Sequence, residues 1–259
     1  MPSAMPFAMP FAMPSAMPSA ISDAVRDAVP QAETSNRQTP IRVWDLPTRL
    51  FHWTLAVAVV GSVVSAKIGG NAMVWHFRLG FLVLTLIAFR LLWGVLGGRW
   101  SRFASFIYAP GTVLRYLRGQ ARADEHLDVG HNPLGSFSVF ALLGLLAIQV
   151  ATGLVADDEI ANIGPLNRFV SGATASQATG WHKEYGSWIV ITLVVLHVLA
   201  IFYYLFKKRH NLIRPMLVGD KPLPSTTPAS ADGLPQRLLA LLLLLVCAAG
   251  AAWVASLAP

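Results

Sequence analysis

The chain has few charged residues and almost no cysteine. Charged residues make up 13% and hydrophobic residues 54% of its 259 positions, whereas soluble domains carry roughly 25% charged residues. This balance excludes an intrinsically disordered protein and disfavours an ordinary soluble enzyme. The single cysteine, Cys247, excludes a disulfide framework, a cysteine-rich zinc site, a protein-held iron–sulfur cluster and haem attached through a C-x-x-C-H motif.

Long apolar segments take the place of the missing charge. A bilayer span needs about 20 mostly apolar residues, and five segments qualify: 50–68, 74–96, 134–155, 185–206 and 238–257. None of the 13 acidic residues falls inside them. Arg90 is the only basic residue deep within one, and a charge at mid-bilayer costs about 3 kcal/mol. The sequence therefore predicts an all-α integral membrane protein.

The distribution of Lys and Arg predicts the orientation. Of 20 such residues, fifteen lie before the first span, between the second and third, or between the fourth and fifth. Four lie on the opposite side: Lys67, Arg78, Arg168 and Lys183. The positive-inside rule then places the N-terminus of this multi-pass protein in the cytoplasm and the C-terminus outside. The net charge of +7 is explained by topology and needs no nucleic-acid partner.

The two ends differ in composition from the rest. Residues 1–20 are five MPSA or MPFA tetrapeptides, and a proline at every fourth position prevents a helix. We expect a disordered tail over 1–39 and a flexible linker over 218–236, which is rich in proline and serine. The last segment, 237–259, is predicted to be a fifth transmembrane helix, a lipid-facing anchor without histidine.

Four of the seven histidines lie in spans or at their borders. His52 and His76 are near the starts of the first and second spans, His182 lies just before the fourth, and His197 lies within the fourth. His182 and His197 are 15 residues apart, which puts them on one broad helix face about 22 Å apart along the axis. Since successive spans run in opposite directions, His52 shares the inner depth with His197. His76 shares the outer depth with His182. An ionisable residue at membrane depth is a functional candidate.

Two histidines at one depth on different helices are what a bis-imidazole haem iron needs. Two such pairs predict two haems stacked across the membrane. Imidazole also binds zinc and copper, but those sites usually take three or four protein ligands, and no carboxylate or thiol is available at these depths. Gly80, four residues after His76, offers room on the same face.

Arg90 has two interpretations. It lies 14 residues after His76 on the same helix face and about 21 Å deeper, near the inner pair. A buried arginine there suits a haem propionate as a bidentate partner. Alternatively, it extends to the interface from a helix end. Gln149 in the third span is expected to be an interhelical hydrogen-bond partner.

Several motifs resemble one family. They are RVWDLPTRLFHW (42–53), WHFRLGF (75–81), FRLLWGVLG (89–97), GHNPLG (130–135) and WHKEYGSWIVITLVVLH (181–197). Together they resemble the bacterial cytochrome b561 family, which includes the b-type cytochrome subunit of nickel–iron hydrogenases. The resemblance covers about residues 41–217. The N-terminal tail and the fifth span depart from the family pattern.

The resemblance implies a four-helix transmembrane domain over 40–217 that holds two non-covalent b haems. Its ligand positions match His52, His76, His182 and His197. His131, in GHNPLG, is left out of this ligand set. The implied function is single-electron transfer in a respiratory chain, between quinone or quinol and a c-type cytochrome or partner redox enzyme.

Two other functions stay open at this point. The chain is either an electron carrier or a membrane subunit of an oxidoreductase, and the second case makes it the anchor of a nickel–iron hydrogenase or similar dehydrogenase. The alternative of another class is a haem-free membrane transporter or assembly factor. The spans offer few polar residues for a substrate path.

Overall fold

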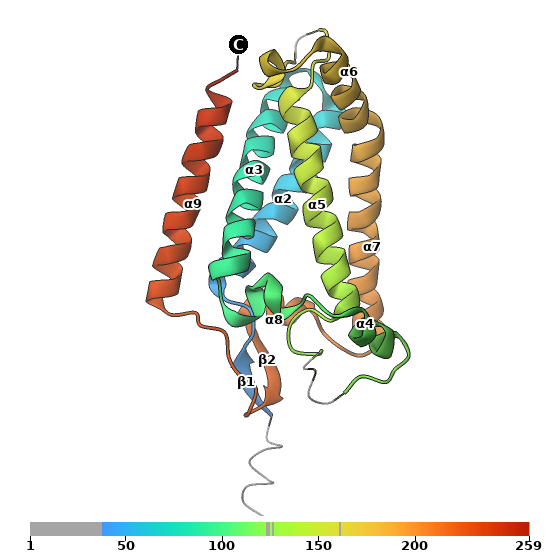
Figure 1. Ribbon diagram of the computed structural model, residues 1–259, viewed down its shortest axis with the longest axis vertical. Helices are drawn as coiled ribbons and strands as arrows, with labels where there is room; N and C mark the ends of the chain where they lie inside the picture. The colour runs from blue at the N-terminus through green and yellow to red at the C-terminus, as the bar shows by residue number, and fades with distance from the viewer. Residues whose placement is uncertain (1–37, 123–124, 126, 161, 259) are drawn as a thin grey trace, which may run out of the picture.

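Five long helices and a two-stranded sheet make up the structure (Figure 1). The computed structural model describes residues 38–122, 125, 127–160 and 162–258. The tail expected over 1–39 therefore lies outside the described residues, except for its last two positions. Those two positions belong to strand β1 (Gln38–Arg42).

Four of the long helices form a bundle, and the fifth stands beside it. The bundle consists of α2 (Leu46–Ile68), α3 (Met73–Leu96), α5 (Pro133–Val155) and α7 (Ser187–Phe206). The fifth helix, α9 (Leu234–Ala255), lies alongside α3 (Figure 1). All five are long and apolar enough to cross a membrane. The predicted architecture, a four-helix bundle with one additional helix, is confirmed.

Capping residues set where the helices begin. Asp45 precedes α2 and accepts a hydrogen bond from the backbone N–H of Thr48, and Asn132 does the same for Gly135 at the start of α5. Both helices carry a proline in their first turn, Pro133 directly after its cap and Pro47 one position further on, where its missing N–H costs nothing. α2 ends at Gly69, whose φ of +69° is one that glycine adopts without strain.

The fourth span is longer than its hydropathy predicts. It runs without a break from Gly172 to Phe206, through α6 (Gly172–Gly180), a π-helical turn η6 (Trp181–Gly186) and α7. The span was expected to begin at residue 185, because 172–180 is rich in Gly, Ala, Ser and Thr. A side-chain cap from Ser171 to Thr174 starts the helix earlier. His182 thus lies inside the helix rather than before it.

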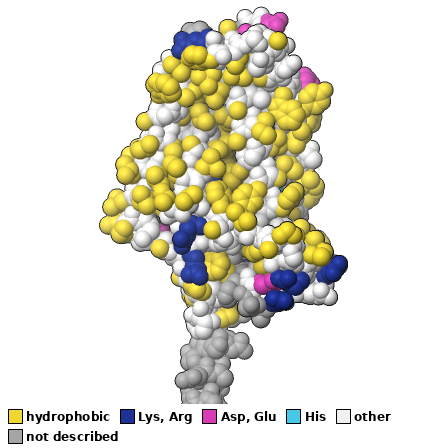
Figure 2. Space-filling model, in the orientation of Figure 1, with side chains coloured by type: hydrophobic (Ala, Val, Ile, Leu, Met, Phe, Trp, Pro, Cys, Tyr) yellow, Lys and Arg dark blue, Asp and Glu magenta, His cyan; other side chains and the backbone are white. Residues whose placement is uncertain are grey.

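Shorter elements connect the spans at both ends of the bundle. They are η1 (Gly70–Ala72), η2 (Arg99–Ser101), η3 (Phe103–Ser105), α4 (Pro110–Leu117), η5 (Asn167–Phe169) and α8 (Ile213–Val218). In Figure 2, hydrophobic side chains cover the helical body, and Lys and Arg gather mainly at the end that carries the β-strands. This surface suits a lipid environment with polar ends.

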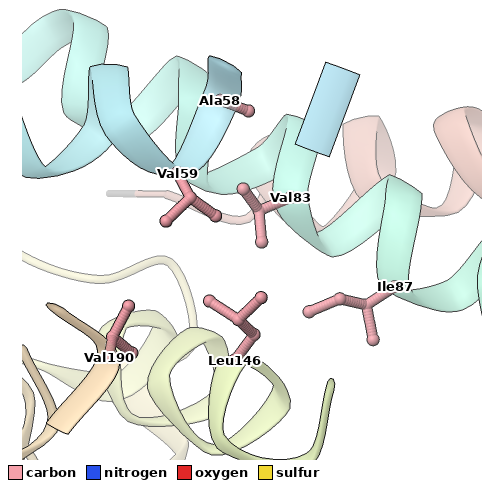
Figure 3. Packing of buried hydrophobic residues seen from close by; sticks show 6 residues of the cluster. All are labelled: Ala58, Val59, Val83, Ile87, Leu146 and Val190. Atoms are coloured by element: carbon pink, nitrogen blue, oxygen red, sulfur yellow. The ribbon is translucent and has the colours of Figure 1, made fainter. Parts of the chain in front are cut away.

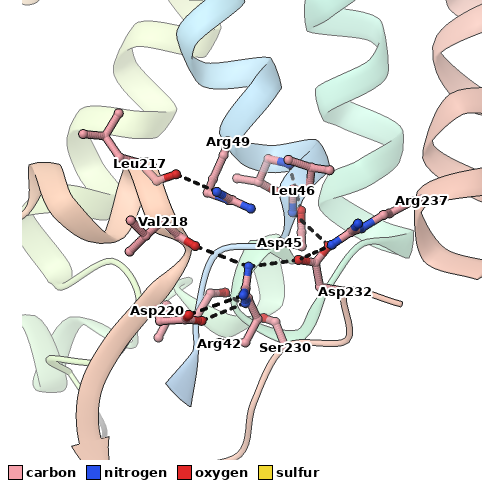
Figure 4. A network of polar contacts seen from close by, with 12 residues as sticks. Arg42, Asp45, Leu46, Arg49, Leu217, Val218, Asp220, Ser230, Asp232 and Arg237 are labelled. Carbon is pink, nitrogen blue, oxygen red and sulfur yellow. Dashed lines mark hydrogen bonds and ion pairs between the residues drawn. The ribbon is translucent and has the colours of Figure 1, made fainter. Parts of the chain in front are cut away.

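The segment expected to be a flexible linker, 218–236, is folded. Strand β2 (Asp220–Pro224) pairs antiparallel with β1, from Gln38 opposite Pro224 to Arg42 opposite Asp220. Arg42 forms ion pairs with Asp220 and Asp232 (Figure 4). The expectation was wrong because the β1 residues that pair with this segment lie more than 170 residues away in sequence. Local composition alone suggested a loop.

α9 packs on the bundle through one face only. Ala240 is buried against Phe51, Phe89 and Trp93, with Leu243, Leu244 and Cys247 packed around this cluster. Leucines on its other faces, such as Leu241, Leu242 and Leu245, are exposed. The helix is therefore a peripheral addition that contributes no histidine to the bundle.

Candidate functional site

The four candidate histidines come together in the two predicted pairs. The rings of His52 on α2 and His197 on α7 have centroids 6.5 Å apart. The rings of His76 on α3 and His182 in η6 have centroids 5.9 Å apart. We call these the inner pair and the outer pair. Each pair joins a helix of the α2–α3 hairpin to the fourth span.

The spacing of each pair suits one metal atom between two imidazoles. A metal bound at about 2.0 Å by one nitrogen of each ring would separate the centroids by about 6 Å. The planes meet at 51° in the inner pair and 85° in the outer pair. Rings that share one axis through a metal are free to adopt such angles. Among the described residues, no three His, Cys, Asp or Glu side chains gather into a metal site.

Hydrogen bonds define the tautomer of the outer pair. Nδ1 of His76 lies 2.9 Å from the carbonyl oxygen of Ser62, and Nδ1 of His182 lies 2.8 Å from that of Gln149. A carbonyl oxygen only accepts, so each Nδ1 carries the proton and donates it. Each Nε2 then keeps its lone pair, which is the form that binds a metal.

The imidazoles of the inner pair form fewer hydrogen bonds with the rest of the chain. Nδ1 of His197 lies 3.4 Å from Oγ of Ser138. Nδ1 of His52 is buried without a hydrogen-bond partner among the described residues. The helices α2, α5 and α7 therefore position this pair mainly through packing.

A cavity of about 610 Å³ contains the outer pair, within the usual size range of cofactor pockets. Gly80 and Gly153 line it together with the two histidines. A Cβ atom on Gly80 would meet nothing within 4 Å, so there is open space on this face of α3, as the sequence predicts. Lys67, Lys183 and Asn162 also line the cavity.

The turn around His182 is built tightly. Nε2 of Gln149 on α5 donates to the backbone carbonyl oxygen of His182, at 2.7 Å. In return, the backbone carbonyl oxygen of Gln149 accepts a hydrogen bond from Nδ1 of His182. A Cβ on Gly186 would lie 2.0 Å from Oε1 of Gln149, so only glycine fits there. The predicted interhelical role of Gln149 is confirmed. Single π-helical turns occur often at functional sites.

A dry layer separates the two pairs. Ala58, Val59, Val83, Ile87, Leu146 and Val190 pack against one another between the helices (Figure 3). Val59 and Val190 each lie seven residues from a histidine of the inner pair, and Val83 lies seven residues from His76, which is about 10 Å of helix. The layer therefore lies about midway between the pairs.

Arg90 is buried at the inner end of α3, not extended to the interface. Its side chain is only 3% exposed. Nη2 donates to the carbonyl oxygen of Ser101 at 2.9 Å, and the guanidinium lies 4.5 Å from the centre of the Phe103 ring. Nη1 is buried without a partner among the described residues. Of the two sequence interpretations, the structure favours a buried arginine with one donor unused.

Asp45 is the acidic group that acts electrostatically on Arg90. It is fully buried, and its two oxygens accept hydrogen bonds from four donors. These are the backbone N–H groups of Thr48 and Gly98, Nε1 of Trp93 and the hydroxyl of Ser101. Its carboxylate therefore ties the start of α2 to the end of α3.

His131 is a half-buried histidine that sequence reasoning left out of the ligand set. Its ring lies between Trp44 and Phe106, with centroids at 4.7 and 4.6 Å. Its Nδ1 is buried without a partner among the described residues. The GHNPLG motif marks the position, but only the fold of the 99–131 connection brings it beside the bundle.

Sequence comparison identifies relatives of the chain. Residues 43–219 match the family model of prokaryotic cytochrome b561. The chain is 25% identical to a probable Ni/Fe-hydrogenase B-type cytochrome subunit of Cupriavidus necator, over 68% of this chain and 85% of that protein. It is 24% identical to the subunit of the same name from Rhodobacter capsulatus, over 73% and 84% respectively. It is 23% identical to the probable Ni/Fe-hydrogenase 1 B-type cytochrome subunit of Escherichia coli K12, over 60% of this chain and 80% of that protein. No solved structure matches the chain significantly.

Proposed function

The chain belongs to the prokaryotic cytochrome b561 family, and on that premise we propose that it holds two b haems, one in each histidine pair. As a family member it is a multi-pass membrane cytochrome b that transfers electrons. His52 and His197 would be the axial ligands of the inner haem, and His76 and His182 those of the outer haem. The 40–217 region would be the haem-carrying domain.

The observation that carries this proposal is the pairing of four half-buried imidazoles across helices at metal-bridging distance. Two further features support haem as the group. The Nδ1 protons of His76 and His182 are used by backbone carbonyls, which leaves Nε2 for iron. The outer pair also lines a cavity that has open space beside Gly80.

The haem supplies a one-electron iron couple when bound. The chain's own residues hold the two sites at opposite depths and keep water from the space between them, through the layer around Leu146 and Val190. A low-dielectric bundle with two imidazole ligands per site, and with Arg90 near the inner end, would tune the two potentials.

The relatives favour a hydrogenase as the redox partner, because the three described above are named as probable Ni/Fe-hydrogenase cytochrome subunits. Electrons would pass between that partner and quinone, quinol or a c-type cytochrome. We further propose residence in the bacterial inner membrane. The excess of Lys and Arg at the end with the β-strands supports a cytoplasmic N-terminus and a periplasmic C-terminus.

Hydrogen-driven reduction tests the partner. In membranes that contain the chain and its host's hydrogenase, we expect molecular hydrogen to reduce the b haem, and the hydrogenase to co-purify with the chain. A matched His76→Ala variant should interrupt the reduction without abolishing membrane insertion. Haem that responds to quinol but never to hydrogen would exclude the hydrogenase partner. A folded chain without any haem would favour the transporter or assembly-factor function.

A further inference from the structure

Buried polar atoms without partners gather at the inner end of the bundle. Among the described residues, the side-chain nitrogens in this state include Nη1 of Arg90, Nδ1 of His131 and Nε of Arg49. Arg49 lies one helical turn before His52, and Arg90 lies two turns from the end of α3. Leaving a buried donor unpaired costs about 1–3 kcal/mol. Two unused guanidinium donors and one unpartnered imidazole nitrogen near one histidine pair indicate a ligand that accepts hydrogen bonds.

His131 is held firmly in this region. Its ring lies between the rings of Trp44 and Phe106, and its carbonyl oxygen accepts a hydrogen bond from Tyr108 at 2.6 Å. The next residue, Asn132, caps α5. The backbone of His131 is held by Tyr108 and by the cap at Asn132, and its ring is held by two aromatic contacts. The imidazole therefore has little freedom to turn toward water.

Ring contacts connect His131 to Arg90. The Arg90 guanidinium lies over Phe103, whose ring centre is 5.9 Å from that of Phe106. Phe106 in turn contacts His131. Burial lowers the pKa of His131 to about 3, with further lowering by the charges of Arg90, His52 and His197. At neutral pH the ring is therefore an uncharged donor close to a cation.

The described acidic side chain that acts on Arg90, Asp45, is not available to these donors. Both of its oxygens already accept hydrogen bonds, from Thr48, Trp93, Gly98 and Ser101. A guanidinium with one buried donor unused, beside an imidazole whose buried Nδ1 has no partner among the described residues, matches a carboxylate that is not part of the chain.

We propose that His131 is a second anchoring donor, beside Arg90, for the propionate carboxylates of the inner haem. The proposal rests on the proposed haem function and deepens it. It assigns His131 a positioning role: it touches the propionate rather than the iron, and it holds the haem edge at the cytoplasmic end of the bundle.

The test measures the midpoint potential of each haem separately by redox titration of the purified chain. His131→Leu removes the donor but keeps apolar bulk between Trp44 and Phe106, and His131→Asn keeps an N–H donor. His210→Leu is the matched control, because His210 is exposed in the connection after α7. All three variants should keep their haem content.

Without the donor, the propionate charge is less well neutralised and favours the oxidised iron. We expect the one-electron equilibrium of the inner haem in His131→Leu to shift threefold to tenfold toward the oxidised form, tenfold being about 59 mV. His131→Asn should restore most of the shift, and the outer haem and the His210→Leu control should not move.

Three results would overturn the proposal: an unchanged inner potential in His131→Leu, an equal shift in His131→Asn, or an equal shift of both haems. If His131→Leu fails to fold, His131→Phe fills the same volume without a donor and takes its place. A wild-type chain that binds no haem would refute the proposed function itself. A chain with two haems and an insensitive inner potential would refute only the role of His131.

Discussion

The imidazole of His182 lies directly against the backbone of Gly153. A Cβ atom on this glycine would be 2.8 Å from Cε1 and 3.1 Å from Nδ1 of the ring. The ring is held there by its hydrogen bond to the carbonyl oxygen of Gln149. α5 therefore sets the orientation of a histidine that belongs to the fourth span. The ring can approach this closely because Gly153 has no side chain.

Gly153→Ala should displace the His182 ring and loosen the outer haem. We expect the haem content to fall from two toward one per chain, while the inner haem keeps its spectrum. Gly144→Ala is the matched control on the same helix, since a Cβ there meets nothing within 4 Å. Pyridine haemochrome analysis of both variants checks this. Equal haem content in the two would contradict the packing argument.

Substitutions at Gly80 test whether the outer haem occupies the cavity, without changing its histidine ligands. The Cβ position of Gly80 is open and this glycine lines the space around the outer pair. Gly80→Ala should bind haem normally, whereas Gly80→Leu should fill the space and exclude the outer haem with the helices intact. Haem content and far-ultraviolet circular dichroism separate the two effects. Normal outer haem in Gly80→Leu would mean that the haem lies elsewhere.

Asp45 should be a structural residue and not a redox one. Asp45→Ala removes the cap of α2 and leaves four donors without an acceptor, so we expect a loss of about 3–5 kcal/mol in stability. Asp220→Asn, at a half-exposed ion pair with Arg42, should change stability by less than about 1 kcal/mol. Thermal unfolding in detergent compares them. Similar midpoints for the two variants would show that the Asp45 network contributes little.

α9 should be dispensable for haem binding, because the four histidines lie on α2, α3, η6 and α7. Removing residues 238–259 takes away the packing of Ala240 against Phe89 and Trp93. We expect a lower unfolding temperature but an unchanged number of haems per chain. Loss of haem on truncation would assign α9 to the haem-binding core.

Much of the bundle and the histidine pairing could be predicted from the sequence. Long apolar segments and the 3.6-residue period determine where His52, His76, His182 and His197 lie along their helices, whatever the loops do. The pairing then follows from depth alone. The continuous fourth span was harder, because the small polar residues of α6 carry no hydropathy signal.

The parts that were missed depend on long-range contacts. Residues 220–232 are ordered by Arg42 and by the backbone of β1, and Ser230 donates to the carbonyl oxygen of Val43. His131 is positioned by ring contacts with Trp44 and Phe106, which lie far from it in sequence. Neither arrangement leaves a periodic pattern in the local sequence.

The central claim, two haems held by two histidine pairs, is tested most directly by counting haem in single-ligand variants. Haem per chain and the reduced-minus-oxidised spectrum should be measured for the wild type, His197→Ala and His76→Ala. The account predicts two b haems in the wild type and about one in each variant, with the inner haem missing in the first and the outer in the second. One haem in the wild type, or the loss of the same haem in both variants, would contradict the pairing.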